Sequence, residues 1–151
     1  MITLKRTTAE NTDFQKLIIL LDQDLAKRDG EDHAFYAQFD KVEKINTVIV
    51  CYQDDVAIGC GAFKEFDSDT VEIKRMFVYP DFRGKGIAGT ILAALETWAG
   101  ELSYNNFILE TGKNNPNAIA LYRKSGYEII PNYAQYENIE ASVCLKKHFG
   151  H

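Results

Sequence analysis

The stretch Arg83-Gly84-Lys85-Gly86-Ile87-Ala88-Gly89 is the most informative in the chain, because it joins a strand pattern to a helix pattern. Glycine carries no Cβ, so backbone amides here can come close to a ligand. The start of a helix also directs unpaired N–H groups and the positive end of its dipole toward the same place. The chain has a formal net charge of −5, yet this stretch holds two cations. We therefore expect it to bind an anion such as a polyphosphate.

Two glycine patterns overlap in this stretch, and the first is the dinucleotide-binding fingerprint. Gly84, Gly86 and Gly89 have its spacing, and Glu110 stands about twenty residues on, where that fingerprint has an acidic residue. Three observations count against it. Residues 79–83 separate the strand from the first glycine, the strand carries three charges, and the remaining chain is too short for repeated βαβ units. A P-loop is excluded because Gly follows Lys85 where Ser or Thr is required.

Length and composition set the outer limits of the interpretation. A chain of 151 residues with 46% hydrophobic and 26% charged residues is typical of one soluble globular domain, which we expect to span residues 1–151. The acidic balance argues against nucleic-acid binding, and no apolar window is long enough to cross a membrane. We therefore expect a cytoplasmic protein. The three cysteines form no CxxC pair, so we expect buried thiols without disulfide or metal.

The apolar periodicity along the chain predicts an α+β, or mixed α/β, single-domain fold. Strands are expected at residues 1–7, 45–53, 56–66, 70–78, 107–111, 127–130 and 141–147. Helices are expected at residues 12–30, 32–39, 85–102 and 117–125. This order predicts a central mixed sheet of about seven strands flanked by four helices, with an antiparallel meander and one strand–helix–strand crossover.

The second glycine pattern, Arg83-x-x-Gly86-x-Ala88, resembles the pyrophosphate-binding motif Q/R-x-x-G-x-G/A of the GNAT superfamily of acyl-CoA-dependent N-acyltransferases. The later stretch from Asn115 to Tyr122, followed by Gly126-Tyr127, resembles the N-x-x-A-x-x-L-Y…G-F signature of the same family. Tyr127 stands where the family usually has Phe. Two motifs in the right order, within a matching order of elements over the whole chain, make the resemblance specific.

The resemblance implies a transferase that moves an acetyl group from acetyl-CoA to an amine by direct attack in a ternary complex. The acceptor is expected to be a primary amine of a small molecule or an amino-acid-like compound. Two alternatives remain: an acetyltransferase of protein N-termini or lysines, and a non-catalytic module that only binds acyl-CoA. The scattered histidines have no metal-ligand spacing, so no metal is expected. The family makes a homodimer possible.

The resemblance further implies where acetyl-CoA binds. It lies between the strands at residues 72–78 and 107–111. The backbone of the motif loop holds the pyrophosphate, the preceding strand pairs with the pantetheine arm, and Asn115 contacts that arm. By position, the residues expected to bind it are Met76, Phe77, Val78, Arg83, Gly84, Lys85, Gly86, Ile87, Ala88, Gly89, Asn115 and Tyr122.

The expected catalytic residues are Tyr122 and Glu72. Tyr122 matches the family's motif Tyr near the CoA sulfur, and a phenol is protonated at neutral pH and can donate a proton. The amine must lose a proton, and Glu72 matches a strand position at which several family members have a base. Glu110 and a water chain are competing bases. The backbone N–H of Phe77 is expected to stabilise the developing oxyanion.

Strict alternation along residues 70–78 predicts which side chains share a face. Glu72, Lys74, Met76 and Val78 would face one way, and Val71, Ile73, Arg75 and Phe77 the other. A carboxylate on a central strand needs a partner or a function, so Glu72 could instead pair with Lys74 or Arg75.

By analogy with the family, residues 25–39 and 131–138 are expected to contact the acceptor. Aromatic and acidic residues there suit a cationic amine, although they could equally form a solvated surface. The Lys74-Arg75 pair could instead meet a carboxylate of the acceptor. The sequence leaves these possibilities open.

Overall fold

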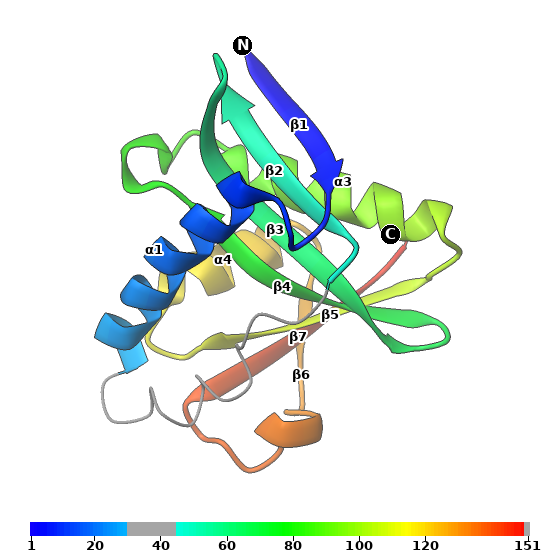
Figure 1. Ribbon diagram of the computed structural model, residues 1–151. Coiled ribbons are helices and arrows are strands. Elements are labelled where there is room, and N and C mark those ends of the chain that lie inside the picture. Colours follow the sequence, from blue (N-terminus) through cyan, green and yellow to red (C-terminus); the bar gives the residue numbers. More distant parts are fainter. Residues whose placement is uncertain (30–44, 150–151) are drawn as a thin grey trace.

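A seven-stranded mixed sheet runs through the molecule in the order β1-β2-β3-β4-β5-β7-β6 (Figure 1). The computed structural model describes residues 1–29 and 45–149. The strands are β1 (Ile2–Thr7), β2 (Val48–Gln53), β3 (Val56–Asp67), β4 (Thr70–Val78), β5 (Asn106–Gly112), β6 (Glu128–Ile130) and β7 (Ser142–His148). The seven strands and the antiparallel meander with one parallel crossover confirm the predicted fold class.

Three α-helices belong to the described residues: α1 (Thr12–Asp29), α3 (Ile87–Glu101) and α4 (Pro116–Lys124). Short 3₁₀ turns, η2 (Pro80–Phe82) and η3 (Ala134–Tyr136), lie in the connections. The fourth predicted helix, at residues 32–39, lies outside the described residues. None of the described helices is long and apolar enough to cross a membrane.

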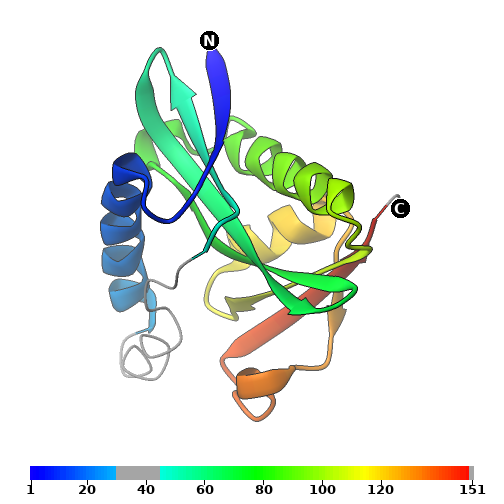
Figure 2. The same cartoon turned by 45° about the vertical axis from the view of Figure 1, so that its right-hand side comes forward.

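The helices cover both faces of the sheet, as the two views show (Figures 1 and 2). On one face, α1 buries a stripe with helical spacing, Phe14, Leu17, Ile18 and Leu21, against β2 and β3. The side chain of Asn11 caps the start of this helix by accepting a hydrogen bond from the Phe14 N–H at 2.9 Å. On the other face, α3 and α4 pack with the sheet in a larger apolar cluster. The molecule is therefore built in three layers.

The sheet opens between β4 and β5. These strands pair in parallel only from Thr70 to Glu72, against Asn106 to Ile108. Beyond that point β4 stays with β3 as far as Val78, and β5 stays with β7 as far as Gly112. Beyond these pairs each of the two strands has one unpaired edge toward the other. This agrees with the predicted separation for residues 73–78 and 109–111, whereas Glu72, Phe107 and Ile108 still pair across the two strands.

A β-bulge at Arg75 interrupts the alternation of β4. Ala62 pairs with Lys74 and Cys60 with Phe77, so Arg75 and Met76 together face the single residue Gly61 of β3. Arg75 has φ = 60°, a conformation that residues other than glycine seldom adopt. A Cβ on Gly61 would lie 2.6 Å from the Met76 sulfur, so glycine is required where the bulge meets α3.

The bulge shows that the predicted division of faces was wrong beyond Lys74. Met76 and Val78 pack with the α3 cluster, as Val71 and Ile73 do, whereas Phe77 packs with α1. Arg75 reaches Asp22 of α1, so it too has left the face that alternation assigns to it. One extra residue in β4 is sufficient to reverse the alternation.

Candidate active site

The motif loop and the first turn of α3 form a backbone cradle for an anion. Gly84 and Gly86 have φ values of +78° and +80°, which favour glycine, and Gly86 is the N-cap of α3 without a side-chain cap. The first bond of the helix runs from the Thr90 N–H to the Gly86 carbonyl at 3.1 Å. The N–H groups of the first helical turn are therefore not used within the helix.

The cradle leaves room for a ligand beside its glycines. A Cβ built on Gly84, Gly86 or Gly89 would meet no protein atom within 4 Å. The neighbouring side chains therefore do not require Gly89, which has an ordinary helical conformation. The loop fits the pyrophosphate of acetyl-CoA, which needs several amide donors at close approach.

Arg83 lies at the entrance to the cradle, where it links three elements. Its Nε donates to the Val78 carbonyl at 2.8 Å, and its Nη2 donates to Asp24 of α1 at 2.8 Å. Its backbone N–H bonds to the Pro80 carbonyl at 3.2 Å. Arg83 therefore fixes the loop to β4 and α1, and its contact with pyrophosphate stays a prediction.

One cavity collects the predicted cofactor residues from β4, the motif loop and α4. It has a volume of about 560 Å³. All the predicted residues except Lys85 line it: Met76, Phe77, Val78, Arg83, Gly84, Gly86, Ile87, Ala88, Gly89, Asn115 and Tyr122. Lys85 instead lies over the Phe82 ring, with its Nζ 5.5 Å from the ring centroid.

Among the residues lining this cavity that the sequence did not indicate, two are charged. Asp24 of α1 and Lys124 of α4 both line it. Lys124 is the last residue of α4, the helix that begins after the N-cap Asn115. Basic residues are common at helix C-termini, where they interact favourably with the helix dipole. The place of Lys124 at a helix end therefore does not by itself indicate a ligand. Asp24 lies 59 residues before its partner Arg83 in the sequence, so no local pattern predicts their contact.

A second, smaller cavity of about 160 Å³ lies in the opening between β4 and β5. Its charged lining residues are Glu72, Lys74, Arg75 and Glu110. Both cavities are lined by Leu21, Met76, Asn115, Ala118 and Tyr122. Tyr122 is therefore at the boundary between the cofactor cavity and a charged cavity on its other side.

Tyr122 is buried, with 7% of its surface exposed. Burial, and then the negative charge of Glu110, raise the pKa of the Tyr122 hydroxyl above its ordinary value. This phenol therefore stays protonated at neutral pH and can act as a proton donor. Its ring packs edge-on against Tyr127, with centroids 5.9 Å apart.

Tyr127 explains the departure from the family's G-F pattern. Its hydroxyl donates to Glu96 of α3 at 2.8 Å, and Lys147 of β7 donates to the same carboxylate at 2.9 Å. A buried phenol is tolerated here because it has this partner. Tyr in place of Phe keeps the ring in the core and adds a hydrogen bond between Tyr127 and Glu96 of α3.

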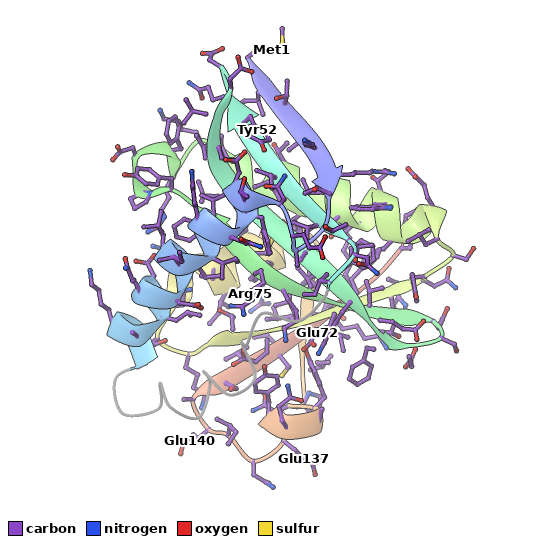
Figure 3. The ribbon with its side chains drawn as sticks, viewed as in Figure 1. Met1, Tyr52, Glu72, Arg75, Glu137 and Glu140 are labelled. Atoms are coloured by element: carbon purple, nitrogen blue, oxygen red, sulfur yellow. The ribbon has the colours of Figure 1, made fainter. Side chains whose placement is uncertain are left out.

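Glu72 is 4% exposed and lines the second cavity. Figure 3 labels it and Arg75, which both belong to β4. Glu72 accepts a hydrogen bond of 2.6 Å from the Tyr133 hydroxyl, which comes from the loop between β6 and β7. Arg75 forms an ion pair with Asp22 at 3.2 Å, so the alternative pairing of Glu72 with Arg75 was wrong. Glu110, the competing base, accepts a hydrogen bond of 2.7 Å from Ser142. Both carboxylates thus reach the same cavity, each held by a hydroxyl.

Asn115 has a structural role as well as its place between the cavities. Its Oδ1 accepts a hydrogen bond from the Ala118 N–H at 3.3 Å and caps α4. Pro116 follows at the first helical position, where proline is favoured. This cap holds the start of α4, and with it the helix that carries Tyr122, against the opening of the sheet.

Comparison with known proteins shows the family. The sequence model of the acetyltransferase (GNAT) family matches residues 14–127. The chain therefore belongs to the GNAT acetyltransferases. The family expected from the two motifs is confirmed.

Individual relatives agree with this membership. An IAA acetyltransferase of Azospirillum brasilense is 32% identical over 100 residues, which make up 66% of this chain and 65% of that protein, less than two thirds of its length. A provisionally assigned acyl-CoA N-acyltransferase from Klebsiella pneumoniae is 27% identical, with a TM-score of 0.82 over 99% of this chain and 98% of that one. A GNAT acetyltransferase from Elizabethkingia anophelis has a TM-score of 0.70 at 20% identity, over 97% of both chains. Its structure holds bound acetyl-CoA, the co-substrate expected here.

Proposed function

We propose that this protein transfers the acetyl group of acetyl-CoA to the primary amine of a small acceptor bound between β4 and β5. The observation that carries the proposal is the meeting of two cavities at Tyr122. One cavity has a backbone cradle suited to pyrophosphate, and the other has carboxylates suited to an amine. Direct transfer requires two substrates to meet at one point, and shared lining residues are the geometry that such a reaction needs.

The chain's own groups divide the work of binding acetyl-CoA. The free N–H groups at the start of α3 hold the pyrophosphate, and the positive end of the helix dipole adds to the attraction. The open edge of β4 at Met76 to Val78 offers backbone groups to the amides of the pantetheine arm. When bound, acetyl-CoA supplies the activated acetyl thioester.

Tyr122 is proposed as the general acid. Its burial keeps the proton on the phenol, so the hydroxyl can protonate the departing sulfur as the carbon–sulfur bond breaks. Because its pKa is raised, the same group is unsuited to act as the base. Its position on both cavities supports this division of roles.

Glu72 is proposed as the general base, directly or through water. The amine must lose a proton to attack, and a lysine-like amine has an ordinary pKa near ~10.4 and is mostly charged at neutral pH. A buried carboxylate both attracts the ammonium form and accepts its proton. Tyr133 fixes the carboxylate by its hydrogen bond. Glu110 lies on the same cavity and is the competing base.

The first experiment separates an enzyme from a binding module. We would measure the melting temperature with acetyl-CoA, and CoA thiol release over a panel of small amines and short peptides. Acetyl-CoA at 100 times its dissociation constant should add about 2.7 kcal/mol of stability, roughly 5–10 °C. Stabilisation without turnover of any amine would favour the binding module. Turnover confined to peptides would favour a protein acceptor.

Three variants test the assignment of the residues. Y122F should lower kcat by at least about tenfold with little change in acetyl-CoA affinity, since it removes the acid hydroxyl and keeps the ring that lines the cavity. Y104F is the matched control, because the Tyr104 hydroxyl contacts Glu65 away from both cavities. E72Q and E110Q identify the base, which is the residue whose loss lowers kcat more. Unchanged kcat in Y122F would disprove the acid assignment.

A further inference from the structure

The bulge in β4 places two successive cations on the acceptor side of the sheet. Lys74 pairs with Ala62, whose side chain faces α1, and Arg75 also reaches α1 through Asp22. Regular alternation would have sent Arg75 to the opposite face, into the apolar cluster under α3. Instead, Lys74 and Arg75 both line the cavity that Glu72 and Glu110 line.

Arg75 is held in this place at a cost. Its φ of +60° is strained for a residue with a Cβ, and its side chain is only 5% exposed. Nη1 pairs with Asp22, but Nη2 is buried and has no hydrogen-bond partner within the described residues. A buried, unpaired donor on a charged group is expensive, so its presence calls for an explanation.

Asp22 satisfies only part of the guanidinium. The ion pair is 3.2 Å long, and the Asp22 side chain is 48% exposed, so water screens the pair. A guanidinium offers five donors in a planar fork that matches a carboxylate with two parallel hydrogen bonds. Nη2 itself is buried, so a second anionic group would reach it by a shift of the Arg75 side chain toward the cavity that this residue lines.

We propose that the acceptor is a zwitterion, an amino acid or a compound like it, and that Arg75 binds its carboxylate. The proposal rests on the function proposed above and names the class of acceptor. Glu72 and Glu110 hold the amino group near Tyr122, while Arg75, three residues further along β4, binds the acid group. The cavity presents two negative and two positive side chains, and a zwitterion complements both pairs. Arg75 is then a specificity-determining residue.

The test compares acceptors that differ only in the carboxyl group. Thiol release from acetyl-CoA would be measured with a panel of α- and ω-amino acids and with the carboxamide of each. We expect kcat/KM for the best amino acid to exceed that for its carboxamide by about 10- to 100-fold, as for loss of a charged hydrogen bond. In R75Q this preference should disappear, with the carboxamide still acetylated.

Two further variants guard against a mere loss of folding. R75K keeps the charge and loses the planar fork, so it should keep part of the preference. R6Q makes the same change at an arginine that pairs with Glu101, outside both cavities, and should keep the full preference. Melting temperatures of all the variants would show that they are folded. Equal kcat/KM for amino acids and carboxamides in the wild type, or an unchanged preference in R75Q, would overturn the proposal.

Failure of this proposal can be distinguished from failure of the proposed function. If carboxamides or simple amines are acetylated as well as amino acids, the acetyltransferase stands and the carboxylate site is disproved. If no amine is acetylated, the proposed function fails. A measurement of amino-acid binding then tests whether Arg75 binds a carboxylate. Amino acids should then stabilise the wild-type CoA complex against heat but not the R75Q complex. Equal stabilisation of the two would disprove the site.

Discussion

Replacing Gly89 by Ala should stabilise the free protein while weakening its hold on acetyl-CoA. Gly89 is in the first turn of α3 with ordinary helical geometry, and a Cβ there would meet no protein atom within 4 Å. The fold therefore accepts alanine without strain. Because alanine loses less backbone entropy on folding, the variant should gain about 0.4–1 kcal/mol. For a chain of this length, that is roughly 1–4 °C in Tm.

The same methyl group would occupy the cradle that the ligand needs. It would hold the pyrophosphate off the amides of the first turn, and loss of one charge-assisted hydrogen bond is worth about 1.5–3 kcal/mol, or roughly 10- to 150-fold in Kd. Calorimetric titration with acetyl-CoA measures this Kd, and a melting scan of the free protein measures the stability. The two quantities should move in opposite directions.

A second glycine of the same helix provides the control. A Cβ on Gly100 would lie 2.3 Å from the Phe149 ring, so G100A should lower Tm and leave acetyl-CoA affinity unchanged. If G89A bound acetyl-CoA with the wild-type Kd, the amides of the first turn of α3 would not be the pyrophosphate site. Equal weakening of binding by G89A and G100A would also refute this site, because the effect would then follow from disturbance of α3.

Two remaining predictions concern the buried tyrosines. Y127F restores the family's residue but leaves Glu96 and Lys147 without the phenol. It should therefore lower the free energy of unfolding by about 1–2 kcal/mol, measured by urea unfolding, and leave kcat unchanged. A more stable variant would contradict this. Burial raises the pKa of Tyr122, Tyr127 and Tyr133 in the folded state, so their contribution to stability is complete below the unfolded value of about 10 and is lost as pH rises above it. Tm should therefore fall steeply above about pH 10, and a flat profile from pH 9 to 11 would disprove this.

The sequence was sufficient for the features that depend on local patterns. The two motifs and the order of the elements along the chain could be read from the sequence. The resemblance to the GNAT family implied the opening, which the structure shows beyond Glu72 and Ile108. The motif loop could be recognised because glycines with positive φ and a helix start leave a clear spacing. The second motif also indicated Tyr122, which lines the cavity proposed for acetyl-CoA.

Other features could not be predicted, because they depend on contacts between distant residues. The Asp22–Arg75 pair spans 53 residues, and the Tyr133–Glu72 bond spans 61. The bulge leaves only an ambiguous mark in β4, where Lys74 and Arg75 are two successive charged residues between apolar ones. Gly61 on the neighbouring strand is a second local sign, but a glycine in a strand does not by itself indicate which partner bulges.

The opening of the sheet also bears on how this protein avoids aggregation. An exposed strand edge is a template to which another chain can add, and proteins protect such edges or keep them short. Here β4 and β5 each carry an unpaired edge, but both edges lie in the interior of the sheet, between the layer of α1 and the layer of α3 and α4 (Figure 2). A second polypeptide would need to enter between these layers, whereas a thin, flexible arm with two amides can enter easily. The separation of β4 from β5 therefore leaves a backbone edge that a narrow ligand can reach for hydrogen bonding and a second polypeptide cannot.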